Sequence, residues 1–127
     1  MPAQKITSIK RTLYGYGVLI LAAAILTLSV MPGFGGGINS GIRAHGIAYF
    51  VFSLTIGRYF ASAGTSRPLI KAALAAGAYG GLIETIQYAI PYRCGDIMDA
   101  VINCAAALAA MLPGALLLKR GPDQDGK

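Results

Sequence analysis

Acidic, amide and imidazole side chains gather in two short stretches of the chain. The stretch "ETIQYAIPYRCGDIMDAVIN", residues 84–103, holds five of them and one arginine: Glu84, Gln87, Asp96, Asp99 and Asn103, with Arg93. The stretch "HGIAY" holds His45 and Tyr49. Carboxylates and an imidazole are the groups that general acid–base catalysis uses. With the amides and the guanidinium, they can also hold the polar head of a ligand.

The spacing of these residues predicts that they share helix faces. His45 and Tyr49 are four residues apart, and Glu84 and Gln87 are three apart. Residues at these separations are neighbours on a helix surface. Asp96, Asp99 and Asn103 follow the same rule further along the chain. We therefore expect three separate segments to present polar groups to one another.

Composition predicts the surroundings of these groups. The 127-residue chain is 55% apolar and 13% charged, with a mean hydropathy of +0.59. Soluble domains carry about 25% charged residues. The net charge of +6 comes from basic residues that flank apolar runs instead of forming one stripe. The chain is therefore predicted to be one membrane domain, 1–127, and not a nucleic-acid-binding protein.

Four segments are long and apolar enough to cross a bilayer. They cover about 13–31, 44–63, 72–90 and 97–118, and a polar tail follows at 119–127. The first segment is too long for the apolar region of a signal peptide. Residues 31–41 are expected to form a loop and Pro68 to begin the third helix. Pro113 is expected to kink the fourth helix or to make its final turns irregular. The predicted fold is an all-α membrane protein with four transmembrane helices.

Lysine and arginine predict the orientation. They are concentrated before the first span, between the second and third, and after the fourth. The positive-inside rule therefore puts both termini in the cytoplasm. We expect a multi-pass protein of the inner (cytoplasmic) membrane, with Cys94 and the polar site on the extracytoplasmic side. Glu84 and Asn103 then lie about 10 Å below that surface, at 1.5 Å of helical rise per residue.

An ionisable side chain inside a membrane needs a partner or a watery cavity, and it suggests a functional site. For Glu84 the available partners at that depth are Arg93 and His45, and we expect an ion pair with Arg93. Structural roles are open as well. Asp96 suits the N-cap of the fourth helix, and Gln87 and Asn103 suit hydrogen bonds between helices.

Other residues suggest packing and anchoring. Small residues recur every four positions in the third span, at Ala73, Gly77 and Gly81 and at Ala76 and Gly80, which permits close helix contact. Arg58 is expected to extend to the cytoplasmic surface. Cys94 and Cys104 indicate neither a disulfide framework nor a metal site. No metal and no cofactor is expected, and the oligomeric state is open.

The two stretches, in this order and spacing, resemble the VanZ-like family of small membrane proteins. The shared elements are H-x3-Y, E-x2-Q, P-x-R and D-x3-N, which cover the last three spans. The resemblance makes His45, Tyr49, Glu84, Gln87, Arg93, Asp99 and Asn103 the family positions. The chain departs from the family at Gly41 and Ile42, where an Asp-Lys pair often stands, and at Ala106 and Ala110, where glycines follow the Asn element.

The family is named for a protein linked to low-level resistance to the glycopeptide teicoplanin. We therefore expect an outward-facing pocket that binds an amphipathic envelope molecule, either a glycopeptide or lipopeptide or a lipid-linked precursor. Arg93, Gln87, Tyr49, Asp96 and Asn103 would bind the ligand. If the protein is instead an enzyme that modifies such a molecule, Glu84, Asp99 and His45 would carry the acid–base chemistry. A small proton-coupled exporter is the third hypothesis. Membrane lipids are the expected surroundings in each case.

Overall fold

The computed structural model describes residues 2–33, 38–93 and 95–119, and all regular structure within them is helical. The helices are α1 (Ala3–Val30), α2 (Ile38–Ser62), α3 (Pro68–Ala89), α4 (Ile97–Ala109) and α5 (Met111–Lys119). The predicted all-α class is confirmed. Part of the predicted first loop (34–37), Cys94 and the tail beyond Lys119 lie outside the described residues.

Three helical segments are long and apolar enough to cross a membrane: Ala3–Val30, Pro68–Ala89 and Ile97–Lys119, the last combining α4 and α5. The protein is therefore a multi-pass, membrane-embedded helical bundle. Helix α2 is as long as these but more polar. It contacts all four other helices, and Tyr49, Phe52 and Ile56 on it are buried. Because other helices pack along one side of α2, polar residues on that side can avoid lipid, while Ile47 and Val51 on the other side are exposed.

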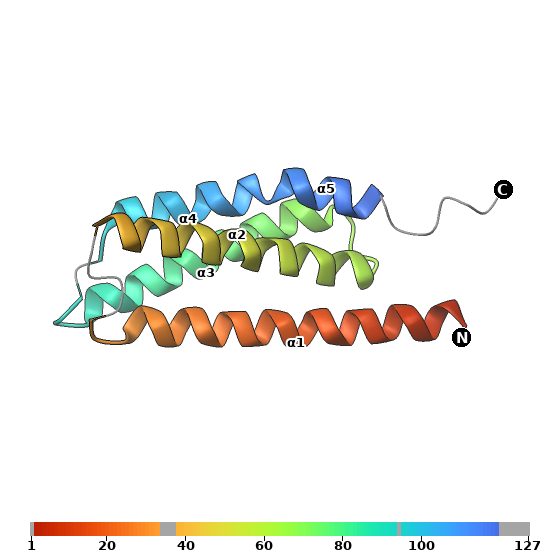
Figure 1. Ribbon diagram of the computed structural model, residues 1–127, viewed down its shortest axis with the longest axis horizontal. Helices are drawn as coiled ribbons and strands as arrows, with labels where there is room; N and C mark the ends of the chain where they lie inside the picture. Colours follow the sequence, from red (N-terminus) through yellow and green to blue (C-terminus); the bar gives the residue numbers. More distant parts are fainter. Residues whose placement is uncertain (1, 34–37, 94, 120–127) are drawn as a thin grey trace.

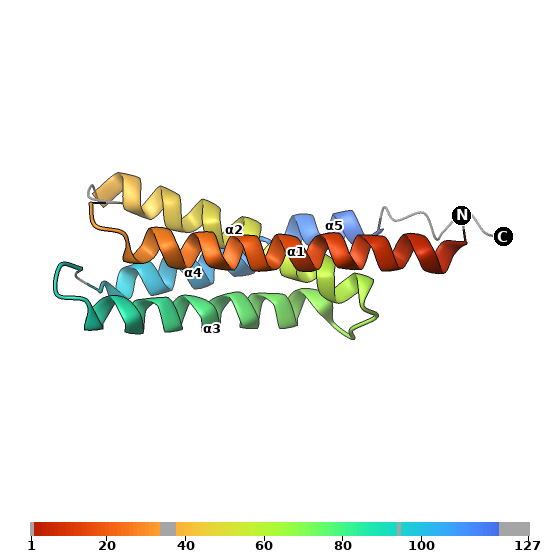
Figure 2. The ribbon, with the colours of Figure 1, turned by 90° about the horizontal axis from the view of Figure 1, so that it is seen from below.

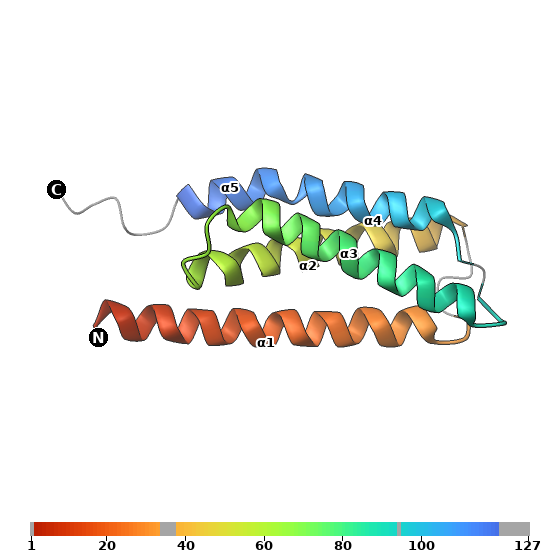
Figure 3. The same cartoon turned by 180° about the vertical axis from the view of Figure 1, so that it is seen from behind.

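The helices run along one common direction and define two ends of the bundle (Figure 1). Helix α1 begins and α5 ends at the same end, which we call the terminal end. The opposite end, where α1 ends and α4 begins, we call the loop end. Helix α1 packs on α2 and α3, while α4 lies against the other side of these two helices (Figures 2 and 3).

Helix boundaries differ from the predicted spans mainly at the N-terminal sides. Helix α1 begins at Ala3, well before the apolar run at Leu13. Helix α2 begins at Ile38, inside the predicted 31–41 loop. Hydropathy marks the part of a helix that contacts lipid, so it misses the polar turns that continue the same helix. The predicted start of α3 is confirmed, with Pro68 in its first turn.

The predicted irregularity near Pro113 is also confirmed. The helix breaks at Ala110, between α4 and α5. Proline has no N–H, so the carbonyl four residues earlier, at Ala109, loses its helical hydrogen bond. The backbone N–H groups of Ala110 and Gly114 still bond to Ala106 and Ala110, at 3.1 and 3.0 Å. The two helices therefore continue in nearly the same direction.

Small residues on α3 permit close contact with α2 and α4. A Cβ atom on Gly80 would lie 3.2 Å from Asn103 Cβ of α4 and 3.2 Å from Tyr49 Cε1 of α2. Ala76, one turn away, is fully buried. The predicted row of Ala76 and Gly80 is thus a packing face. The other predicted row is wrong at Gly81, where an added Cβ would meet nothing within 4 Å.

Candidate functional site

Three helices bring polar side chains together at the loop end. The polar cluster consists of two residues from α2, one from α3, and three from the start of α4: His45, Tyr49, Glu84, Asp96, Asp99 and Asn103. Its outermost link joins α2 to α4, since His45 Nε2 lies 3.7 Å from Asp99 Oδ2. These two side chains are partly exposed, at 18% and 26%.

One helical turn further into the bundle, the cluster is buried and lacks hydrogen bonds. Tyr49 and Asn103 are each 0% exposed, and Gly80 holds both within van der Waals contact. The Tyr49 hydroxyl and both polar atoms of the Asn103 amide have no hydrogen-bond partner among the described residues. Each such buried group costs about 1–3 kcal/mol. Asn103 therefore does not form the interhelical hydrogen bond that its sequence position suggested.

Glu84 is 5% exposed, and only one of its two carboxylate oxygens has a hydrogen-bond partner among the described residues. Its Oε2 atom accepts a hydrogen bond from the backbone N–H of Asp96 at 3.2 Å. Its Oε1 atom is buried without a partner among the described residues. Asp99 and His45 are near enough for their charges to act on Glu84. The carboxylate is therefore fixed on one side and available on the other.

Asp96 has the capping role predicted for it. Its Oδ1 atom accepts a hydrogen bond from Met98 N at 2.9 Å, and its backbone is extended, as an N-cap requires. Because Asp96 also donates its backbone N–H to Glu84, the cap connects the start of α4 to the end of α3. The two carboxylates are thereby held at neighbouring positions.

Arg93 does not pair with Glu84, and that sequence prediction is wrong. Its Nη2 atom donates to the carbonyl oxygens of Leu28 at 3.2 Å and Met31 at 2.6 Å, at the end of α1. These carbonyls have no helical partners and carry the negative end of the helix dipole. A guanidinium therefore binds there without needing a carboxylate.

Two other side chains bind the same end of α1. Gln87 Nε2 donates to Ser29 O at 3.0 Å, and the Tyr92 hydroxyl donates to Val30 O at 2.9 Å. With Arg93 they form the α1 clamp, which we define as Gln87, Tyr92 and Arg93. The sequence left two roles open for Gln87, hydrogen bonding between helices and ligand binding. In the structure its buried side chain forms a hydrogen bond between helices.

Arg58 lies near the terminal end, away from the polar cluster. Its guanidinium donates to the Tyr14 hydroxyl at 2.8 Å and to Leu117 O at 3.3 Å. It also lies 5.3 Å from the centre of the Tyr14 ring. Arg58 thus links α1, α2 and α5 instead of only extending to the surface, as the sequence suggested.

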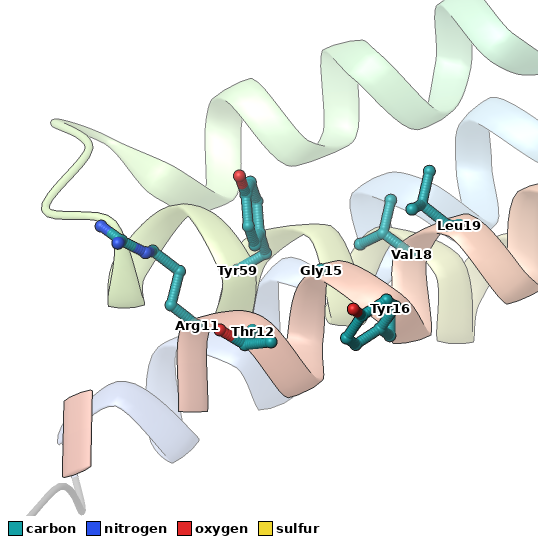
Figure 4. Close-up of a pocket in the computed structure, with 7 residues that line it drawn as sticks. All are labelled: Arg11, Thr12, Gly15, Tyr16, Val18, Leu19 and Tyr59. Atoms are coloured by element: carbon teal, nitrogen blue, oxygen red, sulfur yellow. The ribbon is translucent and has the colours of Figure 1, made fainter. Parts of the chain in front are cut away.

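Two open hollows lie near the terminal end as well. One, of about 420 Å³, is formed by the first half of α1 and by Tyr59 of α2 (Figure 4). The other, of about 330 Å³, is formed by the start of α1 and Ser62. Neither includes a residue of the polar cluster.

The sequence predicts the members of the polar cluster and names Gly80 as a position of close helix contact, but it does not indicate that Tyr49 and Asn103 meet at Gly80. Gly80 lies four residues before Glu84 and hence on the same face of α3. The sequence also does not identify Tyr92 as a member of the clamp. Among the residues that the structure describes, no three His, Cys, Asp or Glu side chains are grouped to hold a metal ion.

Comparison with protein-family models, curated proteins and solved structures gives no match for this chain. The similarity to the VanZ-like family therefore rests on the motif residues alone.

Proposed function

We propose that this chain is a VanZ-like, four-span protein of the cytoplasmic membrane whose loop end faces outward and binds the polar head of an amphipathic envelope molecule. The observation that carries the proposal is the set of buried, unpartnered polar atoms on Tyr49, Glu84 and Asn103. A ligand that supplies complementary groups would recover the free energy that these unpaired atoms cost.

The length and position of α2 support a fourth span. Its 25 residues correspond to about 37 Å, enough to cross the hydrocarbon core of about 30 Å. Basic residues support the orientation. Lys5, Lys10 and Arg11 belong to the terminal end and Arg67 and Lys71 to the nearby α2–α3 turn, whereas the loop end has Arg43 and Arg93. The positive-inside rule makes the terminal end cytoplasmic.

The charges of the cluster favour a particular head group. Glu84, Asp96 and Asp99 contribute three carboxylates. The cation expected to hold an anionic head, Arg93, already donates through Nη2 to two carbonyls of α1, while its Nε is buried without a partner among the described residues. The unpartnered oxygens of Glu84 and Asn103 accept hydrogen bonds. A primary ammonium fits best, because it carries a positive charge and three N–H donors.

Entry to the buried groups passes the His45–Asp99 pair. The pair lies one turn further out than Tyr49 and Asn103, on the same helices. Its separation of 3.7 Å is long for a charge-assisted hydrogen bond, so the contact is weak. An incoming ammonium can replace His45 as the partner of Asp99 and then reach Glu84. Among the expected ligands, this favours a peptide-bearing amphiphile with a free amine over a phosphate-headed precursor.

The test is native mass spectrometry of the full chain in detergent with three amphiphiles of equal chain length. Decylamine is expected to bind best, decyltrimethylammonium more weakly because it has no N–H donor, and decyl phosphate least. Glu84→Gln should raise the Kd for decylamine at least tenfold, equivalent to about 1.4 kcal/mol. Asp123→Asn, which removes a carboxylate from the C-terminal tail, is the matched control and should leave the Kd unchanged.

Two outcomes would contradict the proposal. Equal binding of the three amphiphiles would show that only their alkyl chains are recognised. Equal effects of Glu84→Gln and Asp123→Asn would show that the protein's net charge, and not the polar cluster, attracts the amine. If decyl phosphate bound most tightly and its binding still depended on Glu84, the polar cluster would remain the binding site. The assignment of an ammonium head group would then be wrong.

The His45–Asp99 pair supports a second candidate, an enzyme acting on the same class of molecule. A carboxylate beside an imidazole can orient it as a general base, and Glu84 is nearby. In a hydrolysis, His45 would take a proton from water as the water attacks, and Glu84 would donate a proton to the leaving group. Incubating the purified protein with labelled envelope lipids and lipopeptides tests this, because hydrolysis gives products of new mass, whereas binding alone leaves every mass unchanged.

A further inference from the structure

The larger hollow has an apolar floor and one charged end. Six residues of α1 line it over about three turns: Arg11, Thr12, Gly15, Tyr16, Val18 and Leu19. Tyr59 of α2 forms the opposite wall, and Figure 4 shows Arg11 at one end of the group and Leu19 at the other. Gly15 contributes to the hollow because it has no side chain. A Cβ there would lie 3.4 Å from the Tyr59 ring.

The smaller hollow continues from Arg11 toward the start of α1, since Arg11 lines both hollows. Its other lining residues are mostly polar: Ala3, Gln4, Thr7, Ser8 and Ser62. Along the surface of α1 there is therefore an apolar hollow, then a guanidinium, then a hollow lined by hydroxyl and amide groups. A glycerophospholipid has the same order of groups: acyl chain, phosphate and polar head.

The depth of Arg11 in the membrane agrees with this order. The uninterrupted apolar run of α1 begins at Leu13, so Arg11 lies at the boundary between hydrocarbon and head groups. The 28 residues of α1 correspond to about 42 Å, close to the thickness of a bilayer with its head groups. The guanidinium is then level with the lipid phosphates.

The charges at this end favour an anionic lipid. The acidic side chains of the described residues, Glu84, Asp96 and Asp99, all belong to the loop end. Lys5 and Lys10 lie on the same helix as Arg11 and are exposed. Each lysine or arginine near a membrane surface contributes about 1 kcal/mol to the binding of anionic lipids. Arginine also matches the planar geometry of a phosphate with two hydrogen bonds, which lysine cannot do.

We propose that the two hollows on α1 form a binding site for one anionic phospholipid of the membrane's inner leaflet. One acyl chain lies against Gly15, Val18 and Leu19, the phosphate binds Arg11, and the polar head contacts Gln4, Thr7 and Ser62. The site is separate from the polar cluster in position, in charge and in the leaflet it contacts. Its assignment to the inner leaflet rests on the orientation proposed above, but the site does not depend on the ligand proposed for the loop end.

Native mass spectrometry of the purified full chain tests the site, with phosphatidylglycerol and phosphatidylcholine of identical acyl chains added at equal concentrations. We expect phosphatidylglycerol to bind more tightly. Arg11→Gln should weaken its binding about tenfold, and Arg11→Lys should weaken it less, because the charge remains. Lys10→Gln removes the same charge from the neighbouring residue, which lines neither hollow. It should have an effect of twofold or less.

Equal losses in Arg11→Gln and Lys10→Gln would overturn the site, because they would indicate diffuse attraction between charges. Equal binding of the two lipids to the unmodified protein would also overturn it. Arg11 is exposed, so both substitutions should leave the fold intact, and the helical circular dichroism of each variant checks this. Changes at the polar cluster, such as Glu84→Gln, should not alter binding of phosphatidylglycerol.

Discussion

Replacing Arg93 by methionine should detach the end of α1 without unfolding the bundle. Arg93 donates two hydrogen bonds to the last carbonyls of α1, at 3.2 and 2.6 Å. Hydrogen bonds from a charged group contribute about 1.5–3 kcal/mol each. Both bonds come from one nitrogen at an exposed position, where solvent screens them, so the lower part of this range applies to the pair. We expect a loss of about 2 kcal/mol in the free energy of unfolding.

Hydrogen exchange measures this loss where it occurs. A local loss of about 2 kcal/mol corresponds to about 30-fold faster exchange of the amides in the last turn of α1, if that turn opens independently. The middle of α3 should be unaffected. Tyr92→Phe removes one neutral hydrogen bond to the same helix end, at Val30. It should cost about 1 kcal/mol.

Arg43→Met is the matched control, because Arg43 belongs to the same end of the bundle, carries the same charge and is exposed. It should leave the exchange of α1 unchanged. If Arg93→Met exchanges like the unmodified protein, or if Arg43→Met accelerates exchange equally, the clamp does not hold α1. The hydrogen bonds from Arg93 to the helix carbonyls would then not be what stabilises the end of α1.

Three further predictions concern the packing of α3, the N-cap of α4 and the orientation in the membrane. Gly80→Ala should destabilise the protein by about 1–3 kcal/mol, because the added Cβ would lie 3.2 Å from two side chains. Gly81→Ala should be neutral or slightly stabilising, because the added Cβ would meet nothing within 4 Å. Thermal unfolding of the two variants in detergent compares them, and equal effects would contradict the packing of α3 at Gly80. Asp96→Ala should lower the free energy of unfolding by about 1 kcal/mol, because it removes the side chain that caps Met98 N, whereas Asp96→Asn should lower it less. Denaturant unfolding measures both values, and an equal loss in the two variants would argue against the capping role. A membrane-impermeant thiol reagent should label Cys94 in intact cells, and a fusion reporter that puts residues 31–41 in the cytoplasm would reverse the proposed orientation.

The helices and the membership of the polar cluster could be predicted from the sequence for a simple reason. Apolar runs of spanning length identify helices, and spacings of three, four and seven residues identify which side chains share a face. These rules place His45, Glu84 and Asp99 at the same depth from the sequence alone. The N-cap at Asp96 is equally local, because it depends only on residues within one turn.

The choice of partners could not be predicted in this way. Glu84 offers Arg93 a carboxylate at a suitable depth. The sequence does not indicate that the carbonyls at the end of α1 are the nearer partners of Arg93. Similarly, Asn103 and Tyr49 have the right residue types for hydrogen bonding, yet both are buried without partners in the part of the chain that the structure describes. Contacts between helices depend on the packing of side chains such as Gly80, which sequence periodicity does not specify.

The unfolding free energy of Asn103→Leu, measured without added ligand, tests whether the polar cluster is a binding site. Leucine has nearly the shape of asparagine but no polar atoms, so it removes two buried, unpartnered groups without creating a cavity. If these groups are unpaired because they bind a ligand, the variant should be more stable than the unmodified protein by about 1 kcal/mol. A loss of about 2 kcal/mol or more would show that Asn103 is already satisfied within the bundle, and that the polar cluster is part of the protein's own packing and not a binding site.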